Sequence, residues 1–223
     1  MTRAKATRQQ VRAKQRAKAR RQRTRRVGPT ILAAAGAVVV AAVIAIVATG
    51  GSNDDQQTPS AARVSVTGQA LPAFAEGDDP AVGSPAPTLR GEDFGGDPVT
   101  IGEDGRARAV IFLAHWCPHC QREVPLIQDW LDAQGPPQGV DLYSVTTSID
   151  PSQPNYPPQA WLEREGWSVP VLVDDSRDSA ATAYGLTAFP YFVFIDAEGN
   201  VVARATGELT IDQLQAYLAA TST

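Results

Sequence analysis

Residues 108–127 read RAVIFLAHWCPHCQREVPLI and join three kinds of sequence in one run. The first part belongs to the mostly apolar stretch 107–113, which is typical of a buried strand. From residue 118 to residue 133 the apolar side chains recur at helical spacing, which predicts an amphipathic helix. Cys117 and Cys120 lie at the junction. The sequence therefore predicts two thiols at a strand-to-helix turn.

Cys117 and Cys120 are the two cysteines of the chain, and two residues separate them. At a helix start, free backbone N–H groups and the positive end of the helix dipole favour an anion, so we expect the Cys117 thiolate to be stabilised and its pKa lowered. The spacing brings both sulfurs to the same first turn, close enough for a reversible disulfide. His119 lies between them and is expected to add positive charge, which would make the couple more oxidising.

Two other uses of the cysteines remain open in the sequence. A purely structural disulfide would close a loop of only a few residues, and such a short loop stabilises a fold weakly. A copper or zinc carrier would use His115, Cys117, His119 and Cys120 as ligands, but structural zinc sites commonly draw their ligands from two separated segments. We therefore expect neither a metal nor another cofactor, because the disulfide itself carries both electrons. His115 is expected to be a solvated loop side chain.

The charge of the chain is unevenly distributed. Residues 1–26 contain twelve Lys or Arg and no Asp or Glu, so the remaining residues carry −16, the difference between the total of −4 and +12. Residues 31–48 are eighteen consecutive residues without charge, and a helix of that length nearly crosses a bilayer core of about 30 Å. We predict a basic cytoplasmic tail over 1–28 and a transmembrane helix over 29–50, with the rest of the chain extracytoplasmic.

Other targeting signals fit this N-terminal segment less well. A cleaved signal peptide is the main alternative, but its apolar core is usually shorter, about 7 to 15 residues. Arg25 and Arg26 lack the hydrophobic pair that follows a twin-arginine motif, and no Cys follows the apolar run to carry a lipid. The predicted location is the cell membrane, with a single pass. The basic tail is expected to contact membrane lipid, and no nucleic-acid partner is expected.

Downstream of the apolar run, residues 51–80 are predicted to form a flexible linker, because they are rich in small and polar residues. Within them, 63–68 could add a peripheral strand. One domain is predicted over 81–221. Its expected strands are 107–113, 140–146, 191–196 and 201–206, with an extended run over 169–173, and its expected helices are 118–133, 158–166, 179–184 and 211–220. This order predicts an α/β fold in which helices cover a mixed sheet.

Local signals mark several ends of these elements. Gly185 is expected to end its helix in the left-handed conformation, and Thr210 to cap the last helix. Residues 197–200 are expected to form the turn of a hairpin.

Four segments of the predicted domain resemble one known family. They are VGSPAPTLRGEDFGGDPVTI (82–101), RAVIFLAHWCPHCQREVPLI (108–127), VPVLVDD (169–175) and YGLTAFPYFVFIDAEGNVVAR (184–204). Together they resemble the thioredoxin superfamily and, within it, the membrane-anchored TlpA/ResA-like thiol-disulfide oxidoreductases. The resemblance implies a thioredoxin-like fold, a mixed central β-sheet flanked by helices and preceded by one N-terminal transmembrane helix. It also implies a protein disulfide oxidoreductase in which Cys117 is the exposed attacking thiol and Cys120 resolves the mixed disulfide.

The resemblance also assigns roles to neighbouring residues. It implies that Pro190 is a cis-proline facing the disulfide, and that 187–189 form an edge that pairs with the extended backbone of a client. Trp116, Phe189 and Pro190 would then form the surface that binds the substrate. The implied partners are protein thiol or disulfide clients, including apocytochrome c, and a membrane electron-transfer partner.

Two departures from the family pattern concern proton transfer and direction. Many relatives carry a buried carboxylate six residues before the first Cys, where this chain has Ile111. Glu123 is a candidate for proton transfer in its place, although a solvated position on the helix is the ordinary expectation for Glu. Pro118 and His119 match the DsbA-like oxidases, whereas the surrounding domain resembles the reductases. Net reduction of clients and net oxidation of secreted proteins therefore both remain open.

Overall fold

The structure is a computed structural model, and it describes residues 64–222. The predicted basic tail and transmembrane helix lie outside these residues. Within residues 64–222, no helix is both long and apolar enough to cross a membrane.

The domain is built around a five-stranded sheet with the strand order β6-β5-β4-β7-β8. Its strands are β4 (Ala107–Leu113), β5 (Val140–Thr146), β6 (Val171–Val173), β7 (Tyr191–Ile195) and β8 (Val201–Thr206). Strand β4 lies in the centre, parallel to β5 and antiparallel to β7. The sheet is therefore mixed, as the sequence predicts.

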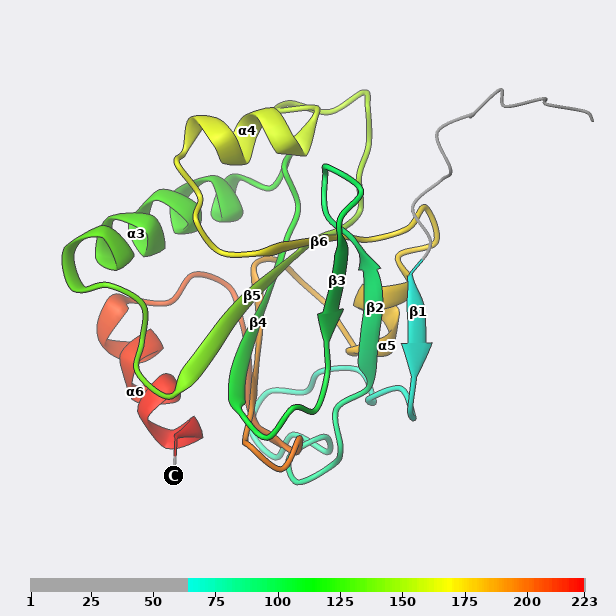
Figure 1. The fold of residues 1–223 in the computed structure, drawn as a ribbon, viewed down its shortest axis with the longest axis vertical. Coiled ribbons are helices and arrows are strands. Elements are labelled where there is room, and N and C mark those ends of the chain that lie inside the picture. The colour runs from blue at the N-terminus through cyan, green and yellow to red at the C-terminus, as the bar shows by residue number, and fades with distance from the viewer. Residues whose placement is uncertain (1–63, 223) are drawn as a thin grey trace, which may run out of the picture. The chain divides into compact units, whose positions relative to one another are not determined.

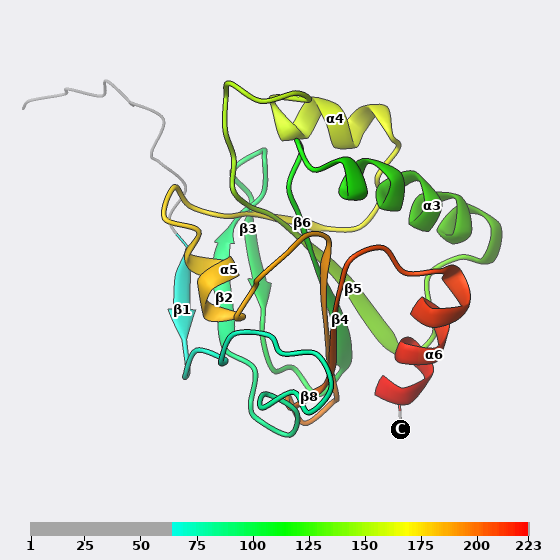
Figure 2. The same ribbon diagram turned by 180° about the vertical axis from the view of Figure 1, so that it is seen from behind.

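Helices cover one face of this sheet, and a second, smaller sheet covers the other (Figures 1 and 2). The first face carries α3 (Pro118–Gln134), α4 (Pro158–Arg164) and α6 (Ile211–Thr221). The second face carries α5 (Ser179–Ala183) and a three-stranded sheet of β1 (Ser65–Thr67), β2 (Thr88–Glu92) and β3 (Pro98–Ile101). Because both faces are covered, all seven residues of β4 are buried, which explains the apolar run in the sequence.

Several local expectations are confirmed. Thr210 caps α6 in a capping box: its hydroxyl accepts from the Gln213 backbone N–H at 3.2 Å, and the Gln213 side chain accepts from the Thr210 N–H at 2.9 Å. Gly185 follows α5 with a φ of 69°, and a Cβ there would lie 2.2 Å from the carbonyl oxygen of Pro72. Strands β7 and β8 form the predicted antiparallel hairpin.

The peripheral strand suggested over 63–68 is confirmed as β1, but the structure differs from the prediction that the surrounding residues up to 80 form a flexible linker. Val64 and Leu71 are buried in the core, and the Leu71 N–H donates to the Ala183 carbonyl at 2.8 Å. The Phe74 N–H likewise donates to the Gly185 carbonyl at 2.9 Å. The packed domain therefore begins well before residue 81. The linker was predicted from the small and polar residues that dominate this segment. A few buried apolar side chains and backbone hydrogen bonds are nevertheless enough to hold it against the domain.

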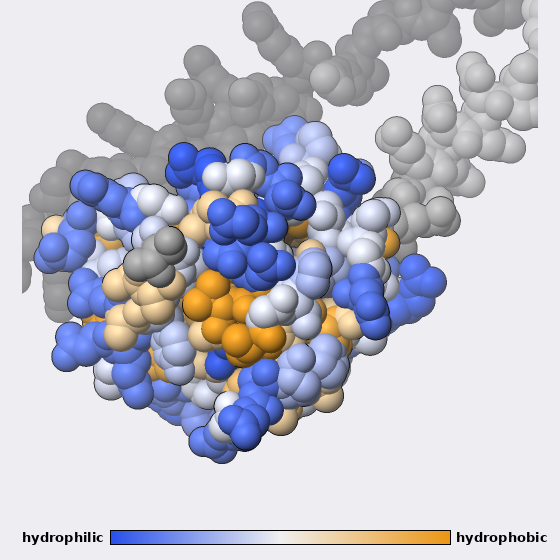
Figure 3. Space-filling model, turned by 90° about the horizontal axis from the view of Figure 1, so that it is seen from below, coloured by the Kyte–Doolittle hydropathy of each residue, from blue (hydrophilic) through white to orange (hydrophobic). Residues whose placement is uncertain are grey.

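The three-stranded sheet is a second difference, since β2 and β3 were not predicted as strands. They are short and contain Gly or Pro, features that weaken a strand signal. Leu89 and Ile101 are fully buried and anchor the two strands to the core. Figure 3 shows one face of the molecule. Most of this face is hydrophilic, and it contains one compact apolar patch; exposed apolar atoms are ordinary on a protein surface.

A buried arginine joins the segment before β2 to the main sheet. The Arg204 side chain has no exposed surface, and it contacts both carboxylate oxygens of Asp79. It also donates to the Pro72 carbonyl at 2.9 Å and to the Tyr191 hydroxyl at 3.0 Å. Because only 7% of the Asp79 side chain is exposed, the loss of the guanidinium would leave a largely buried carboxylate without its charged partner.

We therefore predict that Arg204→Met lowers the free energy of unfolding by about 3–5 kcal/mol, the usual cost of breaking a buried ion pair. The matched control is Arg106→Met. Arg106 pairs with Asp141 at 2.6 Å, but its side chain is 56% exposed. An exposed pair contributes at most about 1 kcal/mol. Chemical denaturation measures both variants, and equal losses would contradict the structural role of Arg204.

Candidate active site

Cys117 lies where β4 ends and α3 begins, as the sequence predicts. It is the N-cap of α3, with extended backbone angles, and Pro118 follows as the first helical residue. The Cys117 N–H donates to the Ala114 carbonyl at 3.0 Å, while its own carbonyl accepts from the Gln121 N–H at 3.1 Å. Proline suits the position after the cap because no helical hydrogen bond is lost there.

The two thiols differ in their access to solvent. Cys117 is 6% exposed and Cys120 is fully buried, and both carry free thiols in this structure. The prediction of an exposed Cys117 is therefore too strong, since only a small part of its surface reaches solvent. Its Sγ lies 3.9 Å from the Phe189 carbonyl oxygen, to which the thiol donates. Of the two thiols, Cys117 alone has surface open to solvent, next to Phe189, and Cys120 has none.

Burial also controls the protonation of Cys120. It raises the pKa of the Cys120 thiol well above the usual range, although the backbone of Ala114 acts in the opposite direction. The negative charges of Cys117 and Glu123 raise the Cys120 pKa further. Cys120 consequently remains a thiol until a nearby base removes its proton.

Glu123 is buried inside the domain, which corrects the expectation of a solvated helix residue. It is 1% exposed, and its carboxylate accepts from the Leu209 backbone N–H at 3.2 and 3.3 Å. Burial raises the pKa of Glu123 to about 7, against the lowering effect of the Leu209 N–H. The sequence did contain a signal for this position. Glu123 follows Cys120 by three residues, so the two side chains lie on the same face of the helix. The structure thus places a group that titrates near neutral pH beside the buried thiol.

His115 is also buried, so the expectation of a solvated loop side chain is wrong. Its Nδ1 lies 2.7 Å from the Pro154 carbonyl oxygen, and its Nε2 accepts from the Asp150 N–H at 3.2 Å. These contacts select the neutral tautomer that carries its proton on Nδ1. Both ring nitrogens are therefore engaged in holding the loop after β5.

The metal-carrier alternative loses support from these contacts, because His115 would have to give up two protein hydrogen bonds to bind a metal. Among residues 64–222, no group of three or more His, Cys, Asp or Glu side chains is arranged to hold a metal ion.

His119 is exposed and lies beside a carboxylate. Its Nδ1 is 2.6 Å from Glu208 Oε1, and Arg122 donates to the same carboxylate at 2.5 Å. Hydrogen bonds from Arg122 and then from His119 lower the pKa of Glu208 to about 2, so Glu208 remains an anion. The positive charge that His119 was expected to contribute is therefore partly offset by a nearby negative charge.

The predicted client-binding residues lie together beside Cys117. The Phe189–Pro190 peptide bond is cis, as predicted. Tyr191, which follows it, pairs with Phe112 near the end of β4, so the start of β7 lies next to the cysteine turn. Trp116 packs edge to face on Phe189, with ring centroids 5.9 Å apart. Residues 187 and 188, which precede Phe189 in the chain, are exposed.

Comparison with known proteins agrees with this geometry. Residues 81–218 match the model of the Redoxin family. The chain is 29% identical over 147 residues to thiol-disulfide oxidoreductase ResA of Geobacillus thermodenitrificans, an alignment covering 65% of this chain and 80% of the relative. It is 26% identical over 130 residues to sporulation thiol-disulfide oxidoreductase A of Bacillus subtilis, covering 58% of this chain and 74% of that protein.

Solved structures show the same fold. The crystal structure of StoA from Bacillus subtilis superposes with a TM-score of 0.50 at 23% identity, covering 62% of this chain and 98% of that one. The thioredoxin domain of a thiol-disulfide oxidoreductase from Bacteroides vulgatus gives a TM-score of 0.52 at 24% identity, with 64% and 99% covered. The chain therefore belongs to the Redoxin family, as a thioredoxin-like protein disulfide oxidoreductase of the TlpA/ResA-like group.

Proposed function

We propose that this protein is an extracytoplasmic, membrane-tethered thiol-disulfide oxidoreductase that reduces disulfides of protein clients. The unequal positions of the two thiols are the observation that carries this proposal. Cys117 lies at the helix start against the client-facing Phe189, whereas Cys120 is sealed inside the domain beside Glu123. Such a pair separates the attacking thiol from the resolving thiol.

The reaction proceeds in two exchanges. The Cys117 thiolate attacks one sulfur of the client disulfide, which forms a mixed disulfide and releases the other client sulfur as a thiolate that takes up a proton. Cys120 then loses its proton and attacks Cys117 Sγ, and the second client sulfur leaves. The client disulfide gains two electrons and the Cys117–Cys120 pair loses two, so no further cofactor is required.

Glu123 is the proton acceptor in the second exchange. Its pKa of about 7 gives it an appreciable carboxylate fraction at neutral pH, and its negative charge acts on the Cys120 thiol. An efficient general base has a pKa close to the working pH. Glu123 therefore occupies the role that a carboxylate before the first Cys plays in other relatives, where this chain has Ile111.

One feature supports a reductase-like direction. An oxidant needs a reduced form that is stabilised by its thiolate. Here the Glu208 carboxylate lies against His119 and offsets the positive charge expected there. This lowers the stability of the reduced, ionised pair and favours electron donation to clients, of which apocytochrome c is the proposed example. A membrane electron-transfer partner would then reduce the pair again.

Oxidation of secreted proteins is the second candidate function, and Pro118 with His119 is the observation that favours it. His119 lies between the cysteines in sequence, and its side chain is 57% exposed. The membrane tether rests on residues 29–50 and on the basic segment before them.

A redox titration of the Cys117–Cys120 pair in the full chain separates the two directions. We expect a midpoint near that of thioredoxin, about −270 mV, whereas a value near that of DsbA, about −120 mV, would indicate an oxidase. Equilibration with defined glutathione or dithiothreitol buffers, followed by thiol alkylation, measures the midpoint.

Substitution of each cysteine tests the order of the two exchanges. We expect Cys117→Ala to abolish disulfide exchange, and Cys120→Ala to accumulate mixed disulfides with clients, because nothing then resolves them. Non-reducing electrophoresis followed by mass spectrometry identifies the trapped clients. Undiminished exchange by Cys117→Ala would refute the mechanism.

Replacement of Glu123 by Gln tests the proton acceptor. In the wild-type chain, resolution of a mixed disulfide between Cys117 and an aromatic thiol should accelerate as pH rises through about 7, because the carboxylate is then formed. We expect Glu123→Gln to slow this step about 10- to 100-fold at pH 8 and to flatten its pH dependence, since a general base is lost. Stopped-flow absorbance of the released thiol measures the rate.

The free energy of unfolding of Glu123→Gln shows whether slower resolution comes from the lost base or from a disturbed structure. Because the folded-state pKa of Glu123 is raised above its ordinary value of 4.5, the native state binds more protons between about pH 4.5 and 7, and the wild-type chain loses stability as pH rises through this window. Glu123→Gln should lack this loss, while Gln still accepts from the Leu209 N–H. Slow resolution together with a destabilised domain above pH 7 would instead indicate a structural role.

A further inference from the structure

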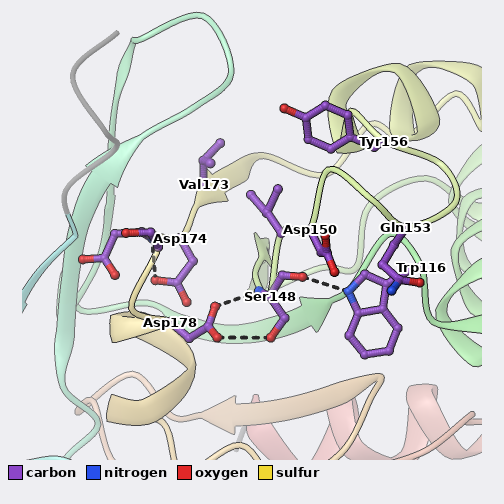
Figure 4. A pocket seen from close by; sticks show the side chains of 11 residues that line it. Trp116, Ser148, Asp150, Gln153, Tyr156, Val173, Asp174 and Asp178 are labelled. Carbon is purple, nitrogen blue, oxygen red and sulfur yellow. Dashed lines mark hydrogen bonds between the residues drawn. The ribbon is translucent and has the colours of Figure 1, made fainter. Parts of the chain in front are cut away.

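A pocket of about 850 Å³ lies beside the active site, on the side of Trp116 that faces the loop after β5 (Figure 4). Its walls are largely apolar and aromatic: Trp116, Ile149, Tyr156 and Val173. Tyr156 is 49% exposed, so its ring is accessible to an occupant of the pocket. The volume is within the range of about 300–1,000 Å³ that holds ligands in other proteins.

The walls are held in place by hydrogen bonds within the domain. The Trp116 indole N–H donates to the Ser148 carbonyl at 2.8 Å, and the Asp178 carboxylate accepts from the Ser148 N–H at 2.8 Å (Figure 4). Asp174 is buried and accepts from the backbone N–H groups of Ala180 and Ala181 at 2.9 and 3.1 Å. Asp174 and Asp178 therefore maintain the pocket, and their oxygens are already engaged.

Two further carboxylates line the pocket: Asp175, whose two oxygens accept from Arg177 and Ser179, and Asp150, whose Oδ1 accepts from Ser152 and which carries the available negative charge. Hydrogen bonds from Ser152 lower the pKa of Asp150. At Asp175 burial opposes ionisation, but hydrogen bonds from Ser179 and Arg177 outweigh it and lower the pKa. Both groups are thus anions at neutral pH.

No cation in the pocket wall compensates this charge. Among the residues that line the pocket there is no Lys, Arg or His. Arg177 approaches Asp175 at 3.4 Å from outside, with 77% of its side chain exposed. Asp150 forms no ion pair with a Lys or Arg in the described part of the chain. An occupant with a positive charge would therefore find an unpaired carboxylate between aromatic walls.

The pocket is continuous with the client-binding surface through a single side chain. Trp116 packs against Phe189, next to the Cys117 Sγ contact, and it also lines the pocket. Residues that flank a client cysteine bonded to Cys117 are therefore within reach of the pocket on the other side of Trp116.

We infer that this pocket, defined by Trp116, Ile149, Asp150, Tyr156 and Asp175, binds a Lys- or Arg-bearing segment that flanks the reactive cysteine of a client. The inference rests on the proposed function, because it names the class of client that the same site prefers. The aliphatic stem of Lys or Arg packs on the aromatic walls, the charged end lies over the ring faces, and Asp150 pairs with it. Charge complementarity of this kind speeds encounter and selects partners.

Matched synthetic peptides test the inference. Each carries one cysteine as a disulfide with 2-mercaptoethanol, and the peptides differ only in having Arg, Gln or Glu two to four residues from the cysteine. The reduced full chain should react about three- to tenfold faster with the Arg peptide than with the Glu peptide at low salt, and this ratio should fall as salt screens the charges. Stopped-flow tryptophan fluorescence measures the second-order rate constants.

Two variants locate the source of the preference. Asp150→Asn should reduce the Arg-to-Glu rate ratio toward one, since Asn carries no charge but keeps the acceptor for Ser152. Tyr156→Ala should reduce the rate with the Arg peptide through loss of the aromatic wall. Asp129→Asn is the control, because it removes one negative charge from an exposed position on α3 outside the pocket and should keep the full ratio.

The outcomes separate this inference from the proposed function. Equal rates for all three peptides, a faster Glu peptide, or an Arg preference that survives Asp150→Asn would overturn the inference and leave the oxidoreductase in place. Failure of every peptide to react, or reaction at an unchanged rate in Cys117→Ala, would overturn the proposed function itself.

Discussion

Burial of strand β4 along its whole length is the constraint on which the rest of the structure depends. Its hydrogen bonds to β5 on one side and β7 on the other hold three chain segments in register, and its end determines where α3 starts. Pairing of Phe112 with Tyr191 brings Pro190 to the turn that carries Cys117. The two halves of the site, about seventy residues apart in sequence, therefore meet because one central strand cannot be exposed to water.

The same burial controls the protonation of Cys120. Packing of α3 against the sheet removes Cys120 and Glu123 from solvent, and desolvation raises the pKa of both groups. One group becomes difficult to deprotonate and the other becomes a base near neutral pH. Outside the core, His119 lies in solvent with Arg122 and Glu208, where charges are screened and offset one another. Burial in the interior therefore raises the pKa values of Cys120 and Glu123, whereas the charges of His119, Arg122 and Glu208 lie at the surface.

The loop after β5 shows how a buried residue can shape a surface. His115 holds this loop through both of its ring nitrogens, and Trp116 holds it again through its indole N–H. Adjacent residues of the cysteine motif thus support the wall of the neighbouring pocket. The cysteine motif therefore carries the redox residues and also positions the wall of the pocket in which we propose that a client binds.

Much of this protein could be predicted from the sequence, because the signals concerned are local. The buried run at 107–113, the helix with Cys117 at its start, the cap at Thr210 and the hairpin near 197–200 each depend on neighbouring residues, and the structure confirms them. The family resemblance also identified the cis-proline at 190 correctly.

Only the tertiary structure decided which polar residues are buried and what they contact. His115 and Glu123 were expected in solvent, yet long-range packing covers both, and residues 64–80 join the core through partners more than one hundred positions away. The charge beside His119 likewise comes from Glu208, 89 residues further along the chain. The physical reason is that periodicity and capping act between residues close in sequence, whereas desolvation and ion pairing depend on segments that only the folded chain brings together.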